Sequence, residues 1–262
     1  MTTARTQGQN YEDGLELGGR LGGETFASLV AELRAIDEGL ADDLVAHAYG
    51  RVLSRPGLEL GDRELVIIAA LAAQGSLPQL EWHLAGALRI GVPPEALREV
   101  LIQLVPFAGW PCALNALVCM QRALAERQLA FTDLERVPRS SADRTKLAEI
   151  GRGHGAEVYP DFPSLERAVA ECDAELAAYL TENAYGQIYD RPGLDKRRRE
   201  LVAVSMLTTL QRLPQLRGHL VGAHRVGCSR IETKEVIITL VLYVGWPAAL
   251  NALRVWAELG AE

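Results

Sequence analysis

The sequence predicts an all-α protein built from two tandem helical domains. The first observation is a repeat: "AYGRVLSRPGL" from Ala48 returns as "AYGQIYDRPGL" from Ala184, and "GWPCALNAL" from Gly109 returns as "GWPAALNAL" from Gly245. Both pairs are offset by 136 residues (184 − 48 and 245 − 109). The second observation is that apolar residues recur at helical spacing. The third is that no segment alternates convincingly with the period of two typical of strands.

The repeated unit is a whole domain, because a solenoid repeat would be shorter. Pro, Ser and charged residues cluster in "ERVPRSSADRT" (Glu135–Thr145), and such composition is typical of a boundary between domains. We therefore expect a first domain over residues 1–135 and a second over residues 136–262.

Each copy contains helical segments in the same order. "LADDLVAHAYGRVL" from Leu40 places its apolar residues near one face, and "RELVIIAALAA" from Arg63 is so apolar that it should be buried all round. "LPQLEWHLAGA" from Leu77 is an apolar helix with one histidine, and "PPEALREVLIQLV" from Pro93 opens with prolines suited to a first turn. In both copies "GWP" then interrupts an apolar run, which predicts a bend before a new helix.

Composition excludes some classes of function. Of 262 residues, 48% are hydrophobic and 23% charged, and the net charge is −7. This is the balance of a globular protein without the basic surface of a nucleic-acid binder. Apolar runs such as "LVIIAALAA" are too short to span a bilayer, and "MTTARTQGQN" has no apolar signal core. We expect a cytoplasmic protein with no membrane or nucleic-acid partner.

The four cysteines, Cys112, Cys119, Cys172 and Cys228, form no CxxC pair and no metal-ligand spacing. We expect buried free thiols and no metal site, because a reduced cysteine behaves as a small hydrophobic residue.

Two histidines occupy the same place in the repeat. His83 in "LPQLEWHLAGA" and His219 in "LPQLRGHLVGA" each lie on or beside an apolar helical stripe. One interpretation is a core histidine bonded to a backbone carbonyl, because duplication preserves packing details. The other interpretation is a duplicated catalytic residue.

Glu64 and Glu200 stand near the start of the repeated apolar helix. Either glutamate could serve there only to favour the helix dipole. If the two helices pack antiparallel, however, each carboxylate could reach the histidine of its copy. A carboxylate fixes the tautomer of an imidazole and stabilises its protonated form, as a general acid requires.

Arg55 and Arg191 recur in "RPGL", where the turn would hold each arginine at a helix end. The guanidinium fork could bind a carboxylate there. The alternative is a surface arginine that caps helix carbonyls.

Strung in this order, these motifs resemble the carboxymuconolactone decarboxylase family, with the first copy carrying "HAYGRVLSRPGL", "RELVIIAAL", "LEWHLAGALRIGV" and "REVLIQLVPFAGWPCALNA". The second copy carries "NAYGQIYDRPGL", "LRGHLVGAHRVGC" and "KEVIITLVLYVGWPAALNA". The opening "YEDGLELGGRLGG" resembles the start of the γ-carboxymuconolactone decarboxylases themselves. The resemblance covers nearly the whole chain, twice, and implies two alkylhydroperoxidase-like helical domains.

Alkylhydroperoxidase-like members of the family follow the frame E-x(11)-C-x-x-C-x(3)-H. Here Glu64 and His83 frame Ser76 and Gln79, while Glu200 and His219 frame Arg212 and Gln215. We therefore expect no thiol peroxidase activity, because that chemistry requires a thiolate and neither copy has a cysteine at these positions.

The resemblance implies a cofactor-independent decarboxylase that acts on a carboxylated lactone or a related small carboxylic acid. Such a substrate supplies its own electron sink, so we expect neither a metal nor an organic cofactor. Arg55 or Arg191 would anchor a carboxylate, His83 or His219 would supply a proton, and Glu64 or Glu200 would orient the imidazole. The residues expected to wall the pocket and exclude water are Trp82, Phe107, Trp110, Tyr243 and Trp246.

Three points stay open in the sequence. Either copy could be the active one, since Trp82, Phe107 and Glu81 of the first copy correspond to Gly218, Tyr243 and Arg217 of the second. The protein could also be a non-catalytic member that binds small molecules, or a lactone or keto-acid isomerase or lyase. The pathway, aromatic catabolism or biosynthesis, is likewise open.

The family also implies an assembly. Single-domain relatives form hexameric rings of paired subunits, so a tandem chain should mimic one pair. We expect a homotrimer with pockets near the domain contacts.

Overall fold

The computed structural model describes residues 6–137 and 141–260, which form helices and no strand. The all-α prediction is confirmed. The elements of the first domain are α1 (Gln7–Gly22), α2 (Glu24–Ile36), α3 (Glu38–Asp43), the π-helix η1 (Leu44–Leu53), α4 (Leu60–Gln74), α5 (Leu77–Arg89), α6 (Pro94–Ala108) and α7 (Trp110–Ala125).

The second domain repeats this order at the same offset. Its elements are α8 (Arg144–Val158), α9 (Phe162–Cys172), α10 (Ala174–Tyr179), the π-helix η3 (Leu180–Ile188), α11 (Lys196–Thr209), α12 (Leu213–Arg225) and α13 (Arg230–Glu258). The boundary expected between residues 135 and 136 lies between the short 3₁₀ turn η2 (Phe131–Asp133) and α8, and residues 138–140 are outside the described part of the chain.

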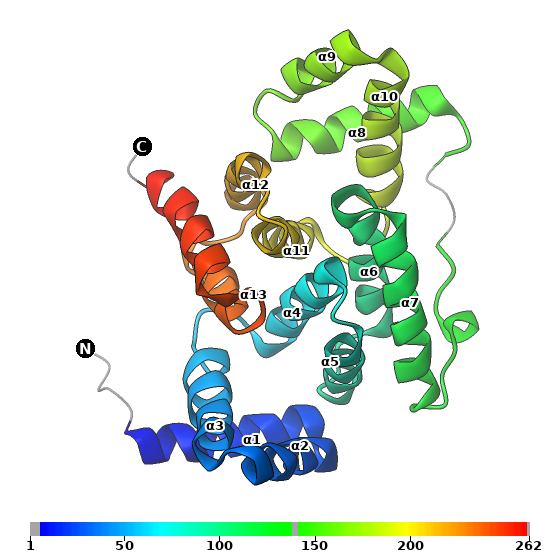
Figure 1. The fold of residues 1–262 in the computed structure, drawn as a ribbon. Coiled ribbons are helices and arrows are strands. Elements are labelled where there is room, and N and C mark those ends of the chain that lie inside the picture. The colour runs from blue at the N-terminus through cyan, green and yellow to red at the C-terminus, as the bar shows by residue number, and fades with distance from the viewer. Residues whose placement is uncertain (1–5, 138–140, 261–262) are drawn as a thin grey trace.

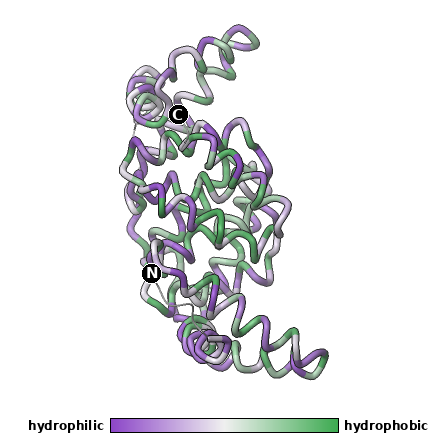
Figure 2. Tube along the Cα trace, turned by 90° about the vertical axis from the view of Figure 1, so that its left-hand side faces the viewer, coloured by the Kyte–Doolittle hydropathy of each residue, from purple (hydrophilic) through white to green (hydrophobic). Residues whose placement is uncertain are grey.

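The two copies are arranged end to end (Figure 1). Helices α1–α3 lie at one end of the molecule and α8–α10 at the other, with α4, α6 and α11 between them. Hydrophobic segments gather in this middle region, and the two ends carry more hydrophilic residues (Figure 2). The region between the two copies is therefore the most apolar part of the molecule.

Helix α4 forms the centre of the first copy, as its apolar sequence predicts. Every residue from 62 to 73 is buried, including the charged Asp62, Arg63 and Glu64. Helix α11 is buried in the same way over residues 199–208. A helix buried on all sides has no solvent face, so each charged residue on it needs a partner inside the protein.

The hydrophobic cores of the two domains interlock through α4 and α11. Val202 and Met206 of the second domain belong to the core of the first. Val66 and Ala70, which stand 136 residues earlier, belong to the core of the second. The exchange is reciprocal, so the contact between the two copies has pseudo-two-fold symmetry.

The bend predicted at "GWP" is present in both copies. Gly109 (φ 85°, ψ 167°) separates α6 from α7, and Gly245 (φ 78°, ψ 167°) interrupts α13. Only glycine adopts such a backbone conformation without a large steric cost. In each copy the bend turns an apolar helix before the tryptophan that follows it.

The expectation that every apolar segment is too short to span a bilayer does not hold for helix α13. By length and composition alone it could do so. However, it is bent at Gly245, and it packs along α4, α11 and α12. These contacts bury part of its apolar surface, while Trp246 and Leu250 stay exposed.

Candidate active site

Each copy brings its glutamate and histidine together. Helices α4 and α5 run back along each other after the turn at Gly75, which places His83 Nδ1 2.8 Å from Glu64 Oε2. Helices α11 and α12 do the same in the second copy, with His219 Nδ1 2.8 Å from Glu200 Oε2. The helices therefore pack antiparallel, which was one of the alternatives that the sequence left open, and this packing produces two carboxylate–imidazole pairs.

Both pairs are buried. Glu64 and Glu200 are 0% exposed, and His83 and His219 are 5% exposed. Because a carboxylate only accepts hydrogen bonds, the Nδ1–H of each imidazole is assigned as the donor, which leaves Nε2 as the second functional nitrogen. The two histidines differ in what surrounds that nitrogen.

In the first copy, Nε2 of His83 is covered by a residue from the other domain. The hydroxyl of Tyr243, on α13, lies 3.3 Å from it, and the Tyr243 and His83 rings meet edge to face. Burial raises the pKa of Tyr243 well above its usual value, so its hydroxyl stays protonated and can donate to Nε2. Trp82 packs against the same imidazole, 4.9 Å away between ring centroids. Both ring nitrogens of His83 therefore face a protein partner.

In the second copy, Nε2 of His219 has no hydrogen-bond partner among the described residues, and the imidazole lines a cavity of about 290 Å³. Phe107 replaces Tyr243 at the corresponding position, and its ring lies 5.2 Å from the imidazole without bringing a hydroxyl. The side chains that line this cavity come from both domains: Gln103, Pro106, Phe107, Tyr159, Leu165, Leu180, Ala184, Tyr185, Ile188, Tyr189, Leu207, Arg212, Gln215 and His219. We call this the His219 cavity.

The carboxylate behind His219 is also better held than its counterpart. Tyr189 donates a hydrogen bond to Glu200 Oε1 at 3.0 Å, while His219 holds Oε2. In the first copy Leu53 stands at the position of Tyr189, and Glu64 Oε1 is buried without a hydrogen-bond partner among the described residues. Both oxygens of Glu200 are thus fixed, whereas Glu64 is fixed through one.

Three tyrosines surround the His219 cavity. Burial raises the pKa of Tyr159, Tyr185 and Tyr189 well above the usual value for tyrosine. Their hydroxyls therefore stay protonated at neutral pH and act as neutral donors.

Tyr159 occupies the space beside Gly218, where a Cβ would come within 2.4 Å of its ring. Gly218 thus admits Tyr159, and the first copy fills the corresponding position with Trp82.

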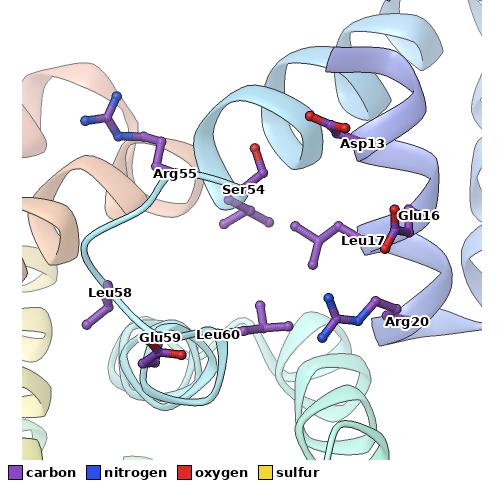
Figure 3. Close-up of a pocket in the computed structure, with 10 residues that line it drawn as sticks. Asp13, Glu16, Leu17, Arg20, Ser54, Arg55, Leu58, Glu59 and Leu60 are labelled. Carbon is purple, nitrogen blue, oxygen red and sulfur yellow. The ribbon is translucent and has the colours of Figure 1, made fainter. Parts of the chain in front are cut away.

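Arg55 and Arg191 lie elsewhere. Arg55 makes a two-pronged ion pair with Glu235 of the other domain at 2.7 and 2.8 Å, and Arg191 makes the same pair with Glu99 at 2.6 and 2.9 Å. Figure 3 shows Arg55 at the edge of a separate cavity, pointing away from Asp13 and Arg20. The guanidinium of each arginine is already bound by a buried carboxylate, which argues against the expected role of these arginines in anchoring a substrate.

Trp110 and Trp246 are also placed differently from the expectation. Their exposed fractions are 62% and 60%, and neither lines the His219 cavity. Each begins the helical segment after the bend, and the bend turns its side chain outward. Of the five aromatic residues expected to wall a pocket, Trp82 and Tyr243 pack on His83 and Phe107 packs on His219.

The cysteines take no part in the site. Cys119 and Cys228 are buried, as expected, but Cys112 is half-buried and Cys172 is exposed. No group of three His, Cys, Asp or Glu side chains within the described ranges is placed to hold a metal ion.

Two residues of the second site received no role from the sequence. Tyr189 fixes Glu200, and Arg212 lines the cavity at the position where alkylhydroperoxidase-like relatives have a cysteine. A position-by-position comparison of the copies would have drawn attention to both, because Leu53 and Ser76 are their counterparts.

Comparison with known proteins places the chain in a family. The model of the carboxymuconolactone decarboxylase family matches residues 39–121 and 174–258, which together make up more than half of the sequence. The chain therefore belongs to the carboxymuconolactone decarboxylase family, with its family domain present twice.

Two curated relatives have decarboxylase names. The 4-carboxymuconolactone decarboxylase of Acinetobacter baylyi is 35% identical over 81 residues, which are 31% of this chain and 60% of the relative. The nitrosuccinic acid decarboxylase npaB of Metarhizium robertsii is 30% identical over 76 residues, which are 29% of this chain and 53% of the relative. The matched segments span between half and two thirds of these relatives.

Proposed function

We propose that the protein is a cofactor-independent decarboxylase of a small carboxylic acid and that the reaction takes place at His219. One observation carries the proposal: Nε2 of His219 faces a cavity while Nδ1 is held by the buried, doubly bonded Glu200. A cavity of about 290 Å³ lies at the lower end of the size range for small-molecule sites. The names of the two relatives support the same class of reaction.

The chemistry assigns a task to each group. The bond between the substrate carbon and its carboxylate breaks, CO2 leaves, and the electron pair moves into an electron-withdrawing group of the substrate, such as a lactone carbonyl. Protonated His219 then gives its Nε2 proton to the carbon and regains a proton from water. Glu200 holds the ring in place and stabilises its positive charge, and Tyr189 holds Glu200.

The walls of the cavity favour this reaction. Phe107 and Tyr159 contact the imidazole edge to face, and leucine, isoleucine and alanine side chains line much of the remainder. A carboxylate next to such walls is poorly solvated and loses charge as CO2 departs. The apolar surface therefore destabilises the bound acid relative to the transition state.

The duplicated chain offers a matched comparison as a test. His219→Gln and His83→Gln remove the same side chain from the same position of the fold, and both keep the neighbouring glutamate. We expect His219→Gln to lower kcat/KM by about 100-fold or more, in the range for loss of a general acid. We expect His83→Gln to retain at least about tenfold more activity than His219→Gln, because Tyr243 covers the His83 imidazole.

The measurement is CO2 release from 4-carboxymuconolactone, from nitrosuccinic acid and from a panel of carboxylated lactones and keto acids. Circular dichroism and thermal unfolding check that both variants fold. A wild-type protein that releases no CO2 from any of these acids would contradict the proposal. Full activity in His219→Gln would contradict it as well.

A further inference from the structure

The proposed reaction develops negative charge on an oxygen of the substrate. When CO2 leaves, the electron pair of the broken bond moves into an electron-withdrawing group such as a lactone carbonyl. The pair returns to carbon when His219 delivers its proton. Until then the oxygen carries the charge, and a hydrogen-bond donor directed at it stabilises the transition state. Because His219 acts on the carbon, the oxygen needs a donor of its own.

Tyr159 is placed beside the imidazole. It follows the last residue of α8 and lines the His219 cavity, and its ring meets the imidazole edge to face, 5.3 Å away between centroids. The ring atom closest to Gly218 is Cε1, which is bonded to the carbon that bears the hydroxyl. The hydroxyl end of the ring therefore packs on α12 at the residue directly before His219.

The other tyrosine hydroxyls of this cavity already have acceptors. Tyr189 donates to Glu200 at 3.0 Å. Burial raises the pKa of both Tyr159 and Tyr185, and the hydrogen bond between them lowers the pKa of Tyr159 but raises that of Tyr185. The proton in this bond therefore belongs to Tyr185. Tyr159 accepts it, and its own O–H remains to be donated to another acceptor.

The properties of Tyr159 suit it to hydrogen bonding rather than to proton transfer. Burial raises its pKa well above the usual value, so it keeps its proton while the substrate oxygen is charged. The electron pair can then return to the carbon that His219 protonates. A neutral donor binds a neutral carbonyl weakly and an oxyanion strongly, so it stabilises the transition state more than the bound substrate.

We propose that Tyr159 is a catalytic residue that donates a hydrogen bond to this oxygen, with Tyr185 as the positioning residue behind it. The inference rests on the proposed function and restricts its substrates to acids whose electron-withdrawing group ends in an oxygen, as in a carbonyl or nitro group. The imidazole of His219 and the hydroxyl of Tyr159 then act on the two ends of one conjugated system. The first copy has Gly23 at the position of Tyr159 and packs Trp82 on its imidazole, so it lacks this hydroxyl.

Steady-state kinetics of phenylalanine variants test the role in turnover. For any acid that wild type decarboxylates, Tyr159→Phe should lower kcat by about 100-fold and change KM by less than about threefold, because the hydrogen bond strengthens only as charge develops. Tyr185→Phe should lower kcat by about three- to tenfold, again with little change in KM, because Tyr159 loses its support. Tyr179→Phe, at an exposed tyrosine outside the cavity, is the matched control and should keep the kcat of wild type. A Tyr159→Phe enzyme with the kcat of wild type would overturn the inference.

Binding of a stable oxyanion tests the donor without turnover. The probe is pentafluorophenol, which is ionised at neutral pH, and its partner is pentafluorobenzene, the same ring without the oxygen. By titration calorimetry we expect wild type to bind the phenolate at least about tenfold more tightly than pentafluorobenzene. Tyr159→Phe should weaken phenolate binding at least about tenfold and change the binding of pentafluorobenzene by less than about threefold. Equal phenolate affinity in wild type and Tyr159→Phe would also overturn the inference.

The same binding measurement separates this inference from the proposed function. In a His219→Gln background, Tyr159→Phe should weaken phenolate binding by a similar factor, because the hydroxyl and the imidazole act on different atoms. A dependence on Tyr159 that vanishes with His219 would count against the hydroxyl as a donor. If His219→Gln keeps full activity or no acid is decarboxylated, the proposed function falls, and the phenolate affinities alone decide whether Tyr159 binds an oxyanion.

Discussion

His83 and His219 occupy equivalent places in their helices and make the same 2.8 Å contact with a buried glutamate. They differ in the aromatic ring that the opposite domain places beside them: His83 meets a tyrosine, which carries a hydroxyl, and His219 meets a phenylalanine, which does not. Tyr243 places its hydroxyl 3.3 Å from Nε2 of His83, whereas Phe107 leaves Nε2 of His219 open to the cavity. The Tyr243 hydroxyl is thus the one hydrogen-bond partner, among the described residues, that distinguishes the two Nε2 atoms, and Trp82 adds a ring beside His83 where the second copy has Gly218.

This difference yields a prediction at the scale of one residue. Phe107→Tyr should bring a hydroxyl to Nε2 of His219 and lower kcat/KM by about tenfold, because the substrate then competes with an internal hydrogen bond. Phe107→Leu is the comparison, since it removes the ring without adding a hydroxyl and should lower kcat/KM less. Steady-state kinetics of the two variants measure the effect, and a Phe107→Tyr enzyme with the kcat/KM of wild type would contradict it.

At the scale of elements, each domain depends on a close contact between a helix and a π-helix. Helix α1 crosses η1 through Gly14 and Gly50, and α8 crosses η3 through Gly151 and Gly186. A Cβ at Gly14 would lie 2.0 Å from the carbonyl oxygen of Val45, which is backbone and has no room to retreat. The missing side chains therefore set the distance between these elements.

Gly14→Ala should lower the free energy of unfolding by about 2 kcal/mol or more, the upper part of the range for overpacking. Gly19→Ala on the same helix is the matched control, because its Cβ meets nothing within 4 Å. There alanine should raise the free energy of unfolding by about 0.5–1 kcal/mol through its better helix propensity. Urea unfolding of both variants checks the pair, and equal stabilities would contradict the contact at Gly14.

At the scale of the whole molecule, buried ion pairs join the two domains. They occur twice, at positions that correspond in the repeat. Glu235 binds Arg55 and lies 3.9 Å from the buried Arg63, and Glu99 binds Arg191 and lies 3.5 Å from Arg199. Each glutamate thus compensates two arginines, one of them fully inside the protein. Arg55 and Arg191, which were expected to bind a substrate, each pair with a glutamate of the other domain.

Glu235→Gln should lower the free energy of unfolding by about 3 kcal/mol, because it removes the carboxylate that compensates the buried Arg63 most strongly. Glu175→Gln is the control, since Glu175 and its partner Arg144 are both more than half exposed, and the loss there should be about 0.5 kcal/mol or less. Urea unfolding measures both changes. Equal losses in the two variants would mean that the interdomain pair adds no more than a surface pair.

The outer surface keeps the repeat as well. Trp110 and Leu114 on α7 and their counterparts Trp246 and Leu250 on α13 are exposed in this single chain. Apolar side chains at the same positions of both domains are what a closed ring of such chains would bury. The homotrimer expected from the family therefore stays a prediction that these surfaces support.

The amino-acid sequence by itself determined the helices and the duplication, and it offered the pairing of each glutamate with its histidine as one of two alternatives. These features depend on local periodicity, on a constant offset of 136 residues and on contacts within one helical hairpin, 19 residues apart. All of this information lies within a short stretch of chain or in its repetition.

Only the tertiary structure decided which imidazole opens to a cavity and what the repeated arginines bind. Tyr243 and His83 are 160 residues apart, and Arg55 and Glu235 are 180 apart. Their contacts arise from the interlocking of α4 and α11, which packs the helices of one domain against the site of the other. The physical reason is that burial and charge compensation depend on neighbours brought together by packing, and no periodicity within one copy specifies them.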